Sequence, residues 1–440
     1  MKKLLLISML VGLSLSSCSL FEGDNGGGYT GNIRKAKSKQ YKEAPPYGMV
    51  FIPGGSYLFG SSEEDIFSTL TGTPKAISVD AFWMDETELT NAEYRNFTNY
   101  VKELNIRKQL GYEITEDRDG NPIDPPLIDW QQKINYKDPE VQEILNSMAY
   151  SGDEAILGKR EIDVRKLVYE WQVIDYNQAA RTRWNHEENR YEGTIINEDG
   201  EEVEVNSRAD VIKKYSVNVY PDTLCWIRDY AYMYNEPFVA RYFWHPAFND
   251  YPVVGVTWHQ ANAYAQWKSE VEAPRKGEAP FEYRLPTEVE WEYAARGGIE
   301  GQLYPWGGFY TTNKEGCYLA NFKPQRGRYG YDGGVRTVAV GSYDPNEFGL
   351  YDMAGNVAEW TNNAFDENAT SFYHDLAPTY TYNARKSDPE IMKRKVIRGG
   401  SWKDISYYIQ CGTRTYEYQD SAKSYVGFRC VRTFAGTAFQ

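Results

Sequence analysis

The chain has 440 residues, and its 62 acidic residues outnumber its 48 Lys and Arg residues, which leaves a net charge of −14 and a pI near 5.0. A chain this acidic, without a Lys- or Arg-rich run, is a poor partner for nucleic acid. Aromatic residues are abundant, with 12 Trp, 37 Tyr and 18 Phe. Because aromatic side chains supply large packing areas, this composition suits a fold of short strands and many loops.

The first 18 residues have the pattern of an exported lipoprotein precursor. Two lysines precede an apolar run at residues 4–15, which is too short to span a bilayer as a permanent helix. The string LSSC at residues 15–18 resembles a bacterial lipobox. It predicts a signal peptide over residues 1–17 and lipidation of the Cys18 thiol; the alternative is an ordinary cleaved signal with a chance cysteine.

The acyl chains predicted on Cys18 would hold the protein at a membrane, since each buried methylene contributes about 0.8 kcal/mol. Ser19, rather than Asp, follows the cysteine, which favours the outer membrane. Residues 18–45 are Gly-rich, then charged, and end at a proline, as is typical of a flexible tether. We therefore expect an outer-membrane lipoprotein.

The first folded segment runs from residue 48 to residue 101. GMVFIPGGSYLFG, at residues 48–60, predicts two strands around a Pro-Gly-Gly turn, and ISVDAFWMDETELT leads from a strand into a helix. Thr90 and Glu93 have the spacing of a capping box at that helix start. The inward stripe of the helix is predicted to be Tyr94, Phe97 and Val101.

A long, mostly polar segment follows, from about residue 102 to residue 241. It contains a predicted helix at Asp138–Met148, whose proline suits the first helical position. It also contains a predicted hairpin at residues 193–205, with the turn at Asp199-Gly200 and alternation on both sides.

The segment Val219–Pro252 is rich in Tyr and Trp. For the insertion at about residues 102–241 as a whole, one interpretation is a decorated surface loop that packs on its own domain. The other, which we favour, is a partner-binding surface, because long insertions with structure of their own are often functional. Its aromatic residues have the composition of interface hot spots, and the candidates are Trp226, Tyr232, Tyr234 and Trp244.

The string YRLPTEVEWEYAARGG, at residues 283–298, predicts a short helix that buries several faces. Thr287 and Glu290 form a capping box, and Gly297 is free to take the left-handed conformation that ends the helix. Thr257 and Gln260 predict a further capped helix upstream.

The same string closely resembles the helix motif of the formylglycine-generating-enzyme family, also called sulfatase-modifying factors. Further stretches match that family in the same order: Gly48–Gly60, Tyr251–Trp258, Phe348–Thr361, Val396–Trp402 and Val426–Cys430. The resemblance implies a single α+β domain over residues 46–436, related to C-type lectins and low in regular secondary structure. The family pattern is interrupted at about residues 102–241.

The resemblance also implies two structural calcium sites. In the first, Asn321 and Asp332 would supply side-chain oxygens, and Phe322 and Gly334 would supply carbonyls. In the second, the side chains would be Asn356 and Glu359. Calcium takes six to eight oxygen ligands of these types. The alternative is that these oxygens cap turns without a metal.

The four histidines are scattered through the chain and form no zinc pattern.

The family's enzymes carry two reactive cysteines that bind copper, the first just after a Gly-Gly-Ser motif and the second five residues later. Here Asp404 and Ile409 hold those positions, and Cys411 lies two residues beyond. One thiol in the wrong register cannot form a copper–thiolate pair. We therefore expect neither copper nor enzymatic activity.

Four cysteines besides Cys18 would face an oxidising compartment, which permits disulfides without requiring them. We predict Cys411–Cys430 as the pair, because both lie in the same terminal segment. The alternative is buried free thiols.

The lipobox, the missing cysteines and the aromatic segment up to Trp258 together resemble the GldK/PorK lipoproteins of gliding motility and type IX secretion. That resemblance implies a non-catalytic, homo-oligomeric ring on the periplasmic face of the outer membrane, built with a soluble GldN/PorN-type partner and near other secretion components. The sibling GldJ type shares parts of the pattern, and the opening at Pro46 favours GldK. The alternatives are a calcium-stabilised extracellular binding module and a formylglycine-generating oxidase.

Overall fold

A four-stranded sheet joins the two ends of the folded chain. In the computed structural model its order is β1-β4-β18-β13, and all neighbouring strands are antiparallel. Its strands are β1 Met49–Ile52, β4 Phe82–Asp85, β18 Val431–Thr433 and β13 Tyr283–Arg284. Because a C-terminal strand lies between N-terminal and central ones, this sheet forms only when distant parts of the chain come together.

The structure describes residues 43–60, 74–116, 120–197, 200–233, 235–272 and 282–436. These residues belong to one unit, Glu43–Gln440, and Cys18 with the predicted signal peptide lies outside the described residues. The predicted tether, residues 18–45, extends too far toward the C-terminus, since the folded domain already includes Glu43. Glu43 is buried against Arg432 and accepts a hydrogen bond from the Ala435 amide at 3.0 Å. Among the described helices, none is long and apolar enough to cross a membrane.

A second four-stranded sheet has the order β16-β15-β14-β17, in which β14 and β17 are parallel and the other pairs antiparallel. Its strands are β16 Thr415–Tyr418, β15 Arg394–Arg398, β14 Ala358–Ala364 and β17 Val426–Gly427. The β15–β16 connection holds the positions of the family's reactive cysteines.

The three predicted capping boxes all form, and each starts a helix. The helices are α2 Asn91–Gln109, α6 Trp258–Val271 and α7 Glu288–Ala295. Their caps are Thr90, Thr257 and Thr287. The predicted inward stripe of α2 is confirmed, since its three residues are fully buried in the largest hydrophobic cluster.

Helix α7 lies inside the molecule and carries two fully buried carboxylates. Glu288 pairs with Arg414, and Glu292 pairs with both Arg296 and Arg398. Buried charges are tolerated only when they are paired and hydrogen-bonded. The short helix is therefore tied by ion pairs to the C-terminal sheet, which explains why this stretch is central to the fold.

The remaining helices and strands are short. The helices are α3 Pro139–Ser147, α4 Tyr176–Ala179, α5 Pro237–Arg241 and α8 Ala369–Phe372. The two-stranded sheets pair β2 Gly55–Phe59 with β3 Lys75–Val79, β5 Glu113–Glu116 with β6 Pro122–Ile128, β7 Val168–Ile174 with β12 Ile212–Asn218, β8 Arg183–Asn185 with β9 Arg190–Glu192, and β10 Thr194–Ile196 with β11 Glu202–Glu204. The predicted insertion helix and hairpin are thus confirmed as α3 and β10–β11.

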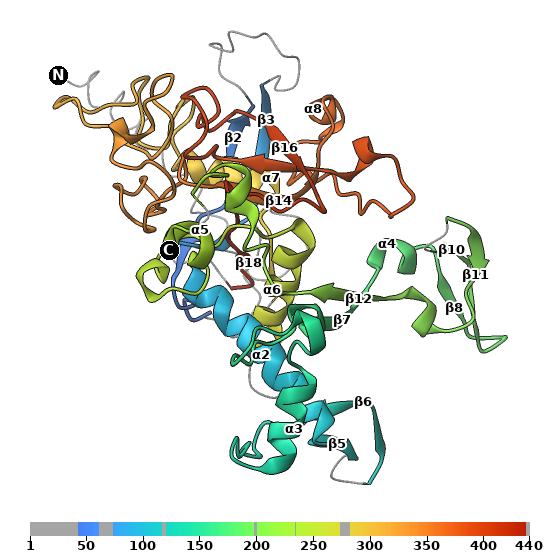
Figure 1. The fold of residues 1–440 in the computed structure, drawn as a ribbon. Helices are drawn as coiled ribbons and strands as arrows, with labels where there is room; N and C mark the ends of the chain where they lie inside the picture. The colour runs from blue at the N-terminus through green and yellow to red at the C-terminus, as the bar shows by residue number, and fades with distance from the viewer. Residues whose placement is uncertain are drawn as a thin grey trace, which may run out of the picture. The chain divides into compact units, whose positions relative to one another are not determined.

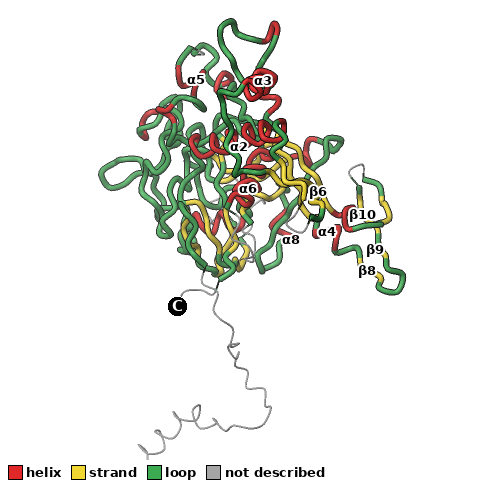
Figure 2. Tube along the Cα trace, turned by 90° about the horizontal axis from the view of Figure 1, so that it is seen from below, coloured by secondary structure: helices red, strands yellow, loops and turns green. Residues whose placement is uncertain are grey.

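The insertion has two structurally different parts. Residues of α3 and β7, including Leu145, Tyr169 and Trp171, are buried in the largest hydrophobic cluster of the domain. Beyond the β7–β12 ribbon, α4 and β8–β11 form a small lobe with a cluster of its own around Ile195 and Val205. Both views place this lobe away from α2 and α5 (Figures 1 and 2). The lobe is therefore an appendage with its own small cluster, whereas α3 and β7 supply side chains to the main core.

Candidate functional site

The loop between β15 and β16 contains Asp404 and Ile409, the positions predicted to correspond to the reactive cysteines of formylglycine-generating enzymes. It begins at Gly399 and Gly400, whose φ angles are +87° and +63°. A Cβ at Gly400 would lie 2.7 Å from the Tyr408 carbonyl oxygen, so only glycine fits there. The side-chain oxygens of Ser401 and Asp404 lie 2.6 Å apart in a hydrogen bond, and burial raises the pKa of Asp404.

Ile409, at the second reactive position, is fully buried and packs in a cluster with Leu303, Phe322 and Ala354. Cys411 is also fully buried, and its burial raises the pKa of the thiol to about 12. A thiol with so high a pKa is protonated at neutral pH and is a poor nucleophile and metal ligand. The loop thus has a carboxyl group, an aliphatic side chain and an inert thiol near the expected reactive positions.

The predicted Cys411–Cys430 disulfide is wrong for this structure, in which both thiols are free and buried. Cys411 packs in the cluster around α7 together with Val431, whereas Cys430 packs in the cluster around α2 and α6. Successive residues of an extended chain point to opposite faces, so Cys430 points away from the face that Val431 shares with Cys411.

Aromatic residues of the insertion cover this C-terminal loop. The indole of Trp402 stacks on Trp226, with ring centroids 5.8 Å apart, and on Tyr230 at 6.2 Å. The Asp229 carboxylate, from the same segment, binds both the Lys403 ammonium and the Ser424 hydroxyl. The insertion and the reactive-position loop therefore form one packed unit.

The four aromatic residues predicted to bind a partner differ in how exposed they are. Trp226 is only 1% exposed, so its prediction as a surface contact is wrong; it packs against Phe238 in the core of this segment. Tyr232 is 99% exposed and Trp244 is 47% exposed. Tyr234 lies outside the described residues. Only Tyr232 and Trp244 are available on the surface that the structure describes.

The four residues predicted for the first calcium site do come together. The Asp332 carboxylate accepts hydrogen bonds from the backbone amides of Phe322 at 2.5 Å and Gly334 at 3.1 Å. Asn321 is fully buried, and among the described residues its Oδ1 has no hydrogen-bond partner. Burial also raises the pKa of Asp332 to about 6. A desolvated carboxylate beside an unpaired amide oxygen is a donor set that fits calcium.

The two side chains predicted for the second site have other partners. The Asn356 amide donates to the Glu88 carboxylate at 2.6 Å, and its oxygen accepts from the Val338 amide. Glu359 accepts hydrogen bonds from the Arg429 guanidinium, the shortest being 2.7 Å, and another from the Trp291 indole at 2.7 Å. A carboxylate neutralised by a buried guanidinium is less available to a cation. This site stays a prediction.

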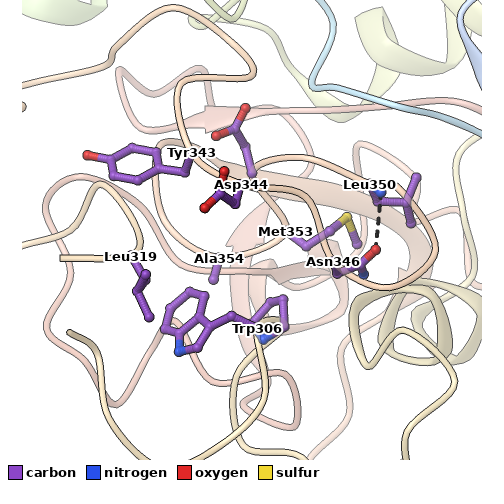
Figure 3. A pocket seen from close by; sticks show the side chains of 10 residues that line it. Trp306, Leu319, Tyr343, Asp344, Asn346, Leu350, Met353 and Ala354 are labelled. Carbon is purple, nitrogen blue, oxygen red and sulfur yellow. Dashed lines mark hydrogen bonds between the residues drawn. The ribbon is translucent and has the colours of Figure 1, made fainter. Parts of the chain in front are cut away.

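Sequence reasoning missed a carboxylate next to these residues. Asp352 lines a small pocket, whose other lining residues include Trp306, Tyr343 and Asp344, labelled in Figure 3. Asp352 is 7% exposed, and its Oδ1 has no hydrogen-bond partner among the described residues. Burial raises its pKa to about 6. Its φ of +55° is uncommon for a residue with a side chain, although Asp tolerates it better than most. Nothing in the surrounding sequence indicates this conformation.

Clusters of three or more His, Cys, Asp or Glu side chains that could hold a metal are absent from the part of the chain that the structure describes. A metal at the first predicted site would therefore depend on amide and carbonyl oxygens besides the Asp332 carboxylate. The fold defines a protein with the architecture of a formylglycine-generating enzyme, and Asp404 and Ile409 stand at the positions that the sequence analysis predicts for the reactive cysteines.

The chain belongs to the family described as "Sulfatase-modifying factor enzyme 1-like domain", whose sequence model matches residues 34–199 and 201–434. The predicted α+β fold class, with its low content of regular secondary structure, is thereby confirmed.

Relatives include both active and inactive proteins. The formylglycine-generating enzyme of Bos taurus is 24% identical over 398 residues, which cover 89% of this chain and 76% of that protein. The inactive Cα-formylglycine-generating enzyme 2 of Bos taurus is 34% identical over 188 residues, 41% of this chain and 50% of that protein. Among solved structures, PvdO from Pseudomonas aeruginosa matches with a TM-score of 0.43 and 17% identity, covering 88% of this chain and 94% of that one.

Proposed function

We propose that this protein is a non-catalytic structural lipoprotein of the type IX secretion and gliding-motility apparatus, of the GldK/PorK type. In this role it forms a periplasmic ring at the outer membrane with a GldN/PorN-type soluble partner. The observation that supports a non-catalytic role most strongly is the reactive-position loop, where Asp404 and Ile409 replace cysteines and Trp402 is covered by Trp226. The family includes inactive relatives, which fits this proposal.

The membrane anchor gives the first test. In the variant Cys18→Ala the thiol that accepts the diacylglyceryl group is gone, so we expect an uncleaved precursor or a released protein. Fractionation of membranes and labelling with a radioactive fatty acid measure this. Normal fractionation together with normal acyl labelling of the variant would disprove lipidation at Cys18.

The role of the insertion is tested by removing the lobe alone. The ends of the ribbon meet at Asp175 and Val211, where the Asp175 amide donates to the Val211 carbonyl at 2.9 Å. Replacing residues 176–210 by Asn-Gly would therefore close β7 and β12 as a hairpin. A cut that began earlier would remove Tyr169 and Trp171 from the core.

We expect the lobe-less protein to melt within a few degrees of the natural one, because the lobe has its own small hydrophobic cluster. If the lobe contacts the ring partner, purification from native membranes in mild detergent should no longer recover that partner. Recovery of the same partner by the folded, lobe-less protein would place the contact elsewhere on the domain.

Structural calcium is the second part of the proposal, held by Asn321 and Asp332 with the carbonyls of Phe322 and Gly334. Ligand bound only to the folded state stabilises it by about 2.7 kcal/mol at a hundredfold excess over its Kd. Adding calcium to chelator-treated protein should therefore raise the melting temperature. In Asp332→Asn the rise should disappear, and in the control Asp344→Asn, an exposed carboxylate, it should remain. A melting curve insensitive to calcium contradicts the proposal.

The second candidate function is a calcium-stabilised extracellular binding module. The pocket at Asp352 favours it, because a buried carboxylate with an unpaired oxygen lines that opening. Recovery of a small ligand, and of no membrane partner, from the purified native protein would favour this second candidate.

A further inference from the structure

A basic loop stands out on this acidic chain. Residues 323–336 carry four cations, Lys323, Arg326, Arg328 and Arg336. The three arginines are exposed and the lysine is half-buried. Among the described residues none of the four forms an ion pair, although the domain contains more carboxylates than cations. The loop is therefore positively charged, whereas the chain as a whole is negatively charged.

Aromatic rings hold three of these cations in place. The Lys323 ammonium lies 4.5 Å from the ring centroid of Tyr329, and the Arg336 guanidinium lies 3.7 Å from that of Phe238 in α5. Arg328 lies over Tyr331 at 4.9 Å and donates a hydrogen bond to its hydroxyl. Cation–π contacts of this kind leave the charge uncompensated while they restrict the side chain. The loop thus presents positive charge that is already positioned for binding.

The β10–β11 hairpin has the opposite character. Glu201, Glu202 and Glu204 are exposed, and among the described residues they form no ion pair. Glu202 and Glu204 pair with Ile196 and Thr194, so they lie two residues apart on one face of the hairpin. Arg385 lies beside Gly200 at the tip, but it pairs with none of the three carboxylates. The hairpin is an exposed acidic edge.

The two charged surfaces cannot meet within one copy. The basic loop packs on α5 through Arg336, and both views show α5 well separated from β10 (Figures 1 and 2). Oppositely charged surfaces at different places on one chain have the arrangement needed for a head-to-tail contact between copies. Head-to-tail contacts produce rings when the rotation closes.

We propose that the acidic β10–β11 hairpin of one copy docks on the basic loop 323–336 of the next copy. This inference rests on the proposed ring function and assigns the two surfaces that join its subunits. The surfaces are exposed and charged, so the contact forms quickly, is weakened by salt, and takes its direction from charge complementarity.

The test uses two full-length versions of this chain with different affinity tags, co-expressed and extracted in detergent. Capture of one tag should recover the other at low salt, and high salt should reduce the recovery. Arg326→Glu with Arg328→Glu in both versions should reduce it about tenfold or more, as should Glu202→Lys with Glu204→Lys. Each variant's melting temperature checks that it folds.

The decisive experiment co-expresses the loop-reversed variant with the hairpin-reversed variant. The reversed loop and the reversed hairpin complement the natural partner surfaces poorly, but they complement each other, so co-expression of the two variants should restore mutual recovery. The matched control for the loop reversal is Lys133→Glu with Lys137→Glu, which lowers the net charge by the same amount at two exposed lysines that form no ion pair in the described structure.

Failure of the mixed variants to recover each other, while each still folds, would overturn the proposal. The proposal would also be overturned if the loop-reversed versions still recovered each other and had lost only their binding to anionic lipid vesicles or to another protein. Because only this chain is present, these outcomes are separate from the recovery of a secretion partner from native membranes, which tests the proposed function itself.

Discussion

The variant Arg429→Leu is expected to lose about 3–5 kcal/mol of folding free energy, because it leaves the Glu359 carboxylate buried without its cation. Both side chains are at most 1% exposed, and the guanidinium donates two hydrogen bonds through Nε at 2.9 and 2.8 Å and one through Nη2 at 2.7 Å. Arg429 also donates to the backbone carbonyls of Asp85 and Tyr351. The loss is measured by unfolding in denaturant.

An exposed ion pair provides the control. Arg183 pairs with Glu192, but its side chain is 82% exposed, so Arg183→Leu should change stability by about 1 kcal/mol or less. The double variant Arg429→Leu with Glu359→Leu removes both charges and should lose less than the single one. If Arg429→Leu behaves like the exposed control, the pair is not what fastens β14 to the C-terminal segment.

The second large effect is expected for Trp226→Ala, which should destabilise the domain by about 3–5 kcal/mol. The indole is 1% exposed and contacts Phe238, Tyr242 and Trp402, with ring centroids at 4.3, 5.1 and 5.8 Å. Truncation would leave a cavity between the insertion and the reactive-position loop. A shift of the denaturation midpoint measures the loss.

Tyr232 gives a matched comparison within the same segment. At 99% exposure its replacement by Ala should leave stability within about 0.5 kcal/mol of the natural protein. If the Trp226→Ala protein kept its stability but bound its partner poorly, Trp226 would be a partner-contacting residue and not a core residue. A loss of stability without a separate loss of partner binding would agree with the buried position of Trp226.

Local features were predictable from the sequence. Each capping box at Thr90, Thr257 and Thr287 formed as expected, because the motif depends only on residues within one helical turn. The β10–β11 hairpin also followed from alternation on either side of a Gly-containing turn. The first calcium cluster came together at the expected residues, although occupation by calcium stays a prediction.

Features that depend on contacts between distant segments were not predictable. Trp226 looked like a surface residue because its covering partner, Trp402, lies in the C-terminal module. The unpaired oxygen of Asp352 and the ion pair that holds Glu359 depend on where whole loops meet. A linear pattern contains no information about the neighbours that desolvate a side chain.

The sequence by itself determined the family and the helix starts, and it places Asp404 and Ile409 at the positions predicted for the reactive cysteines. Only the tertiary structure decided that Cys411 and Cys430 pack in separate clusters, and that α3 and β7 of the insertion contribute to the main core while the lobe is an appendage. The physical reason is range: caps and turns form between near neighbours, whereas burial and ion pairing in this domain join residues hundreds of positions apart, as Arg429 and the carbonyl of Asp85 illustrate.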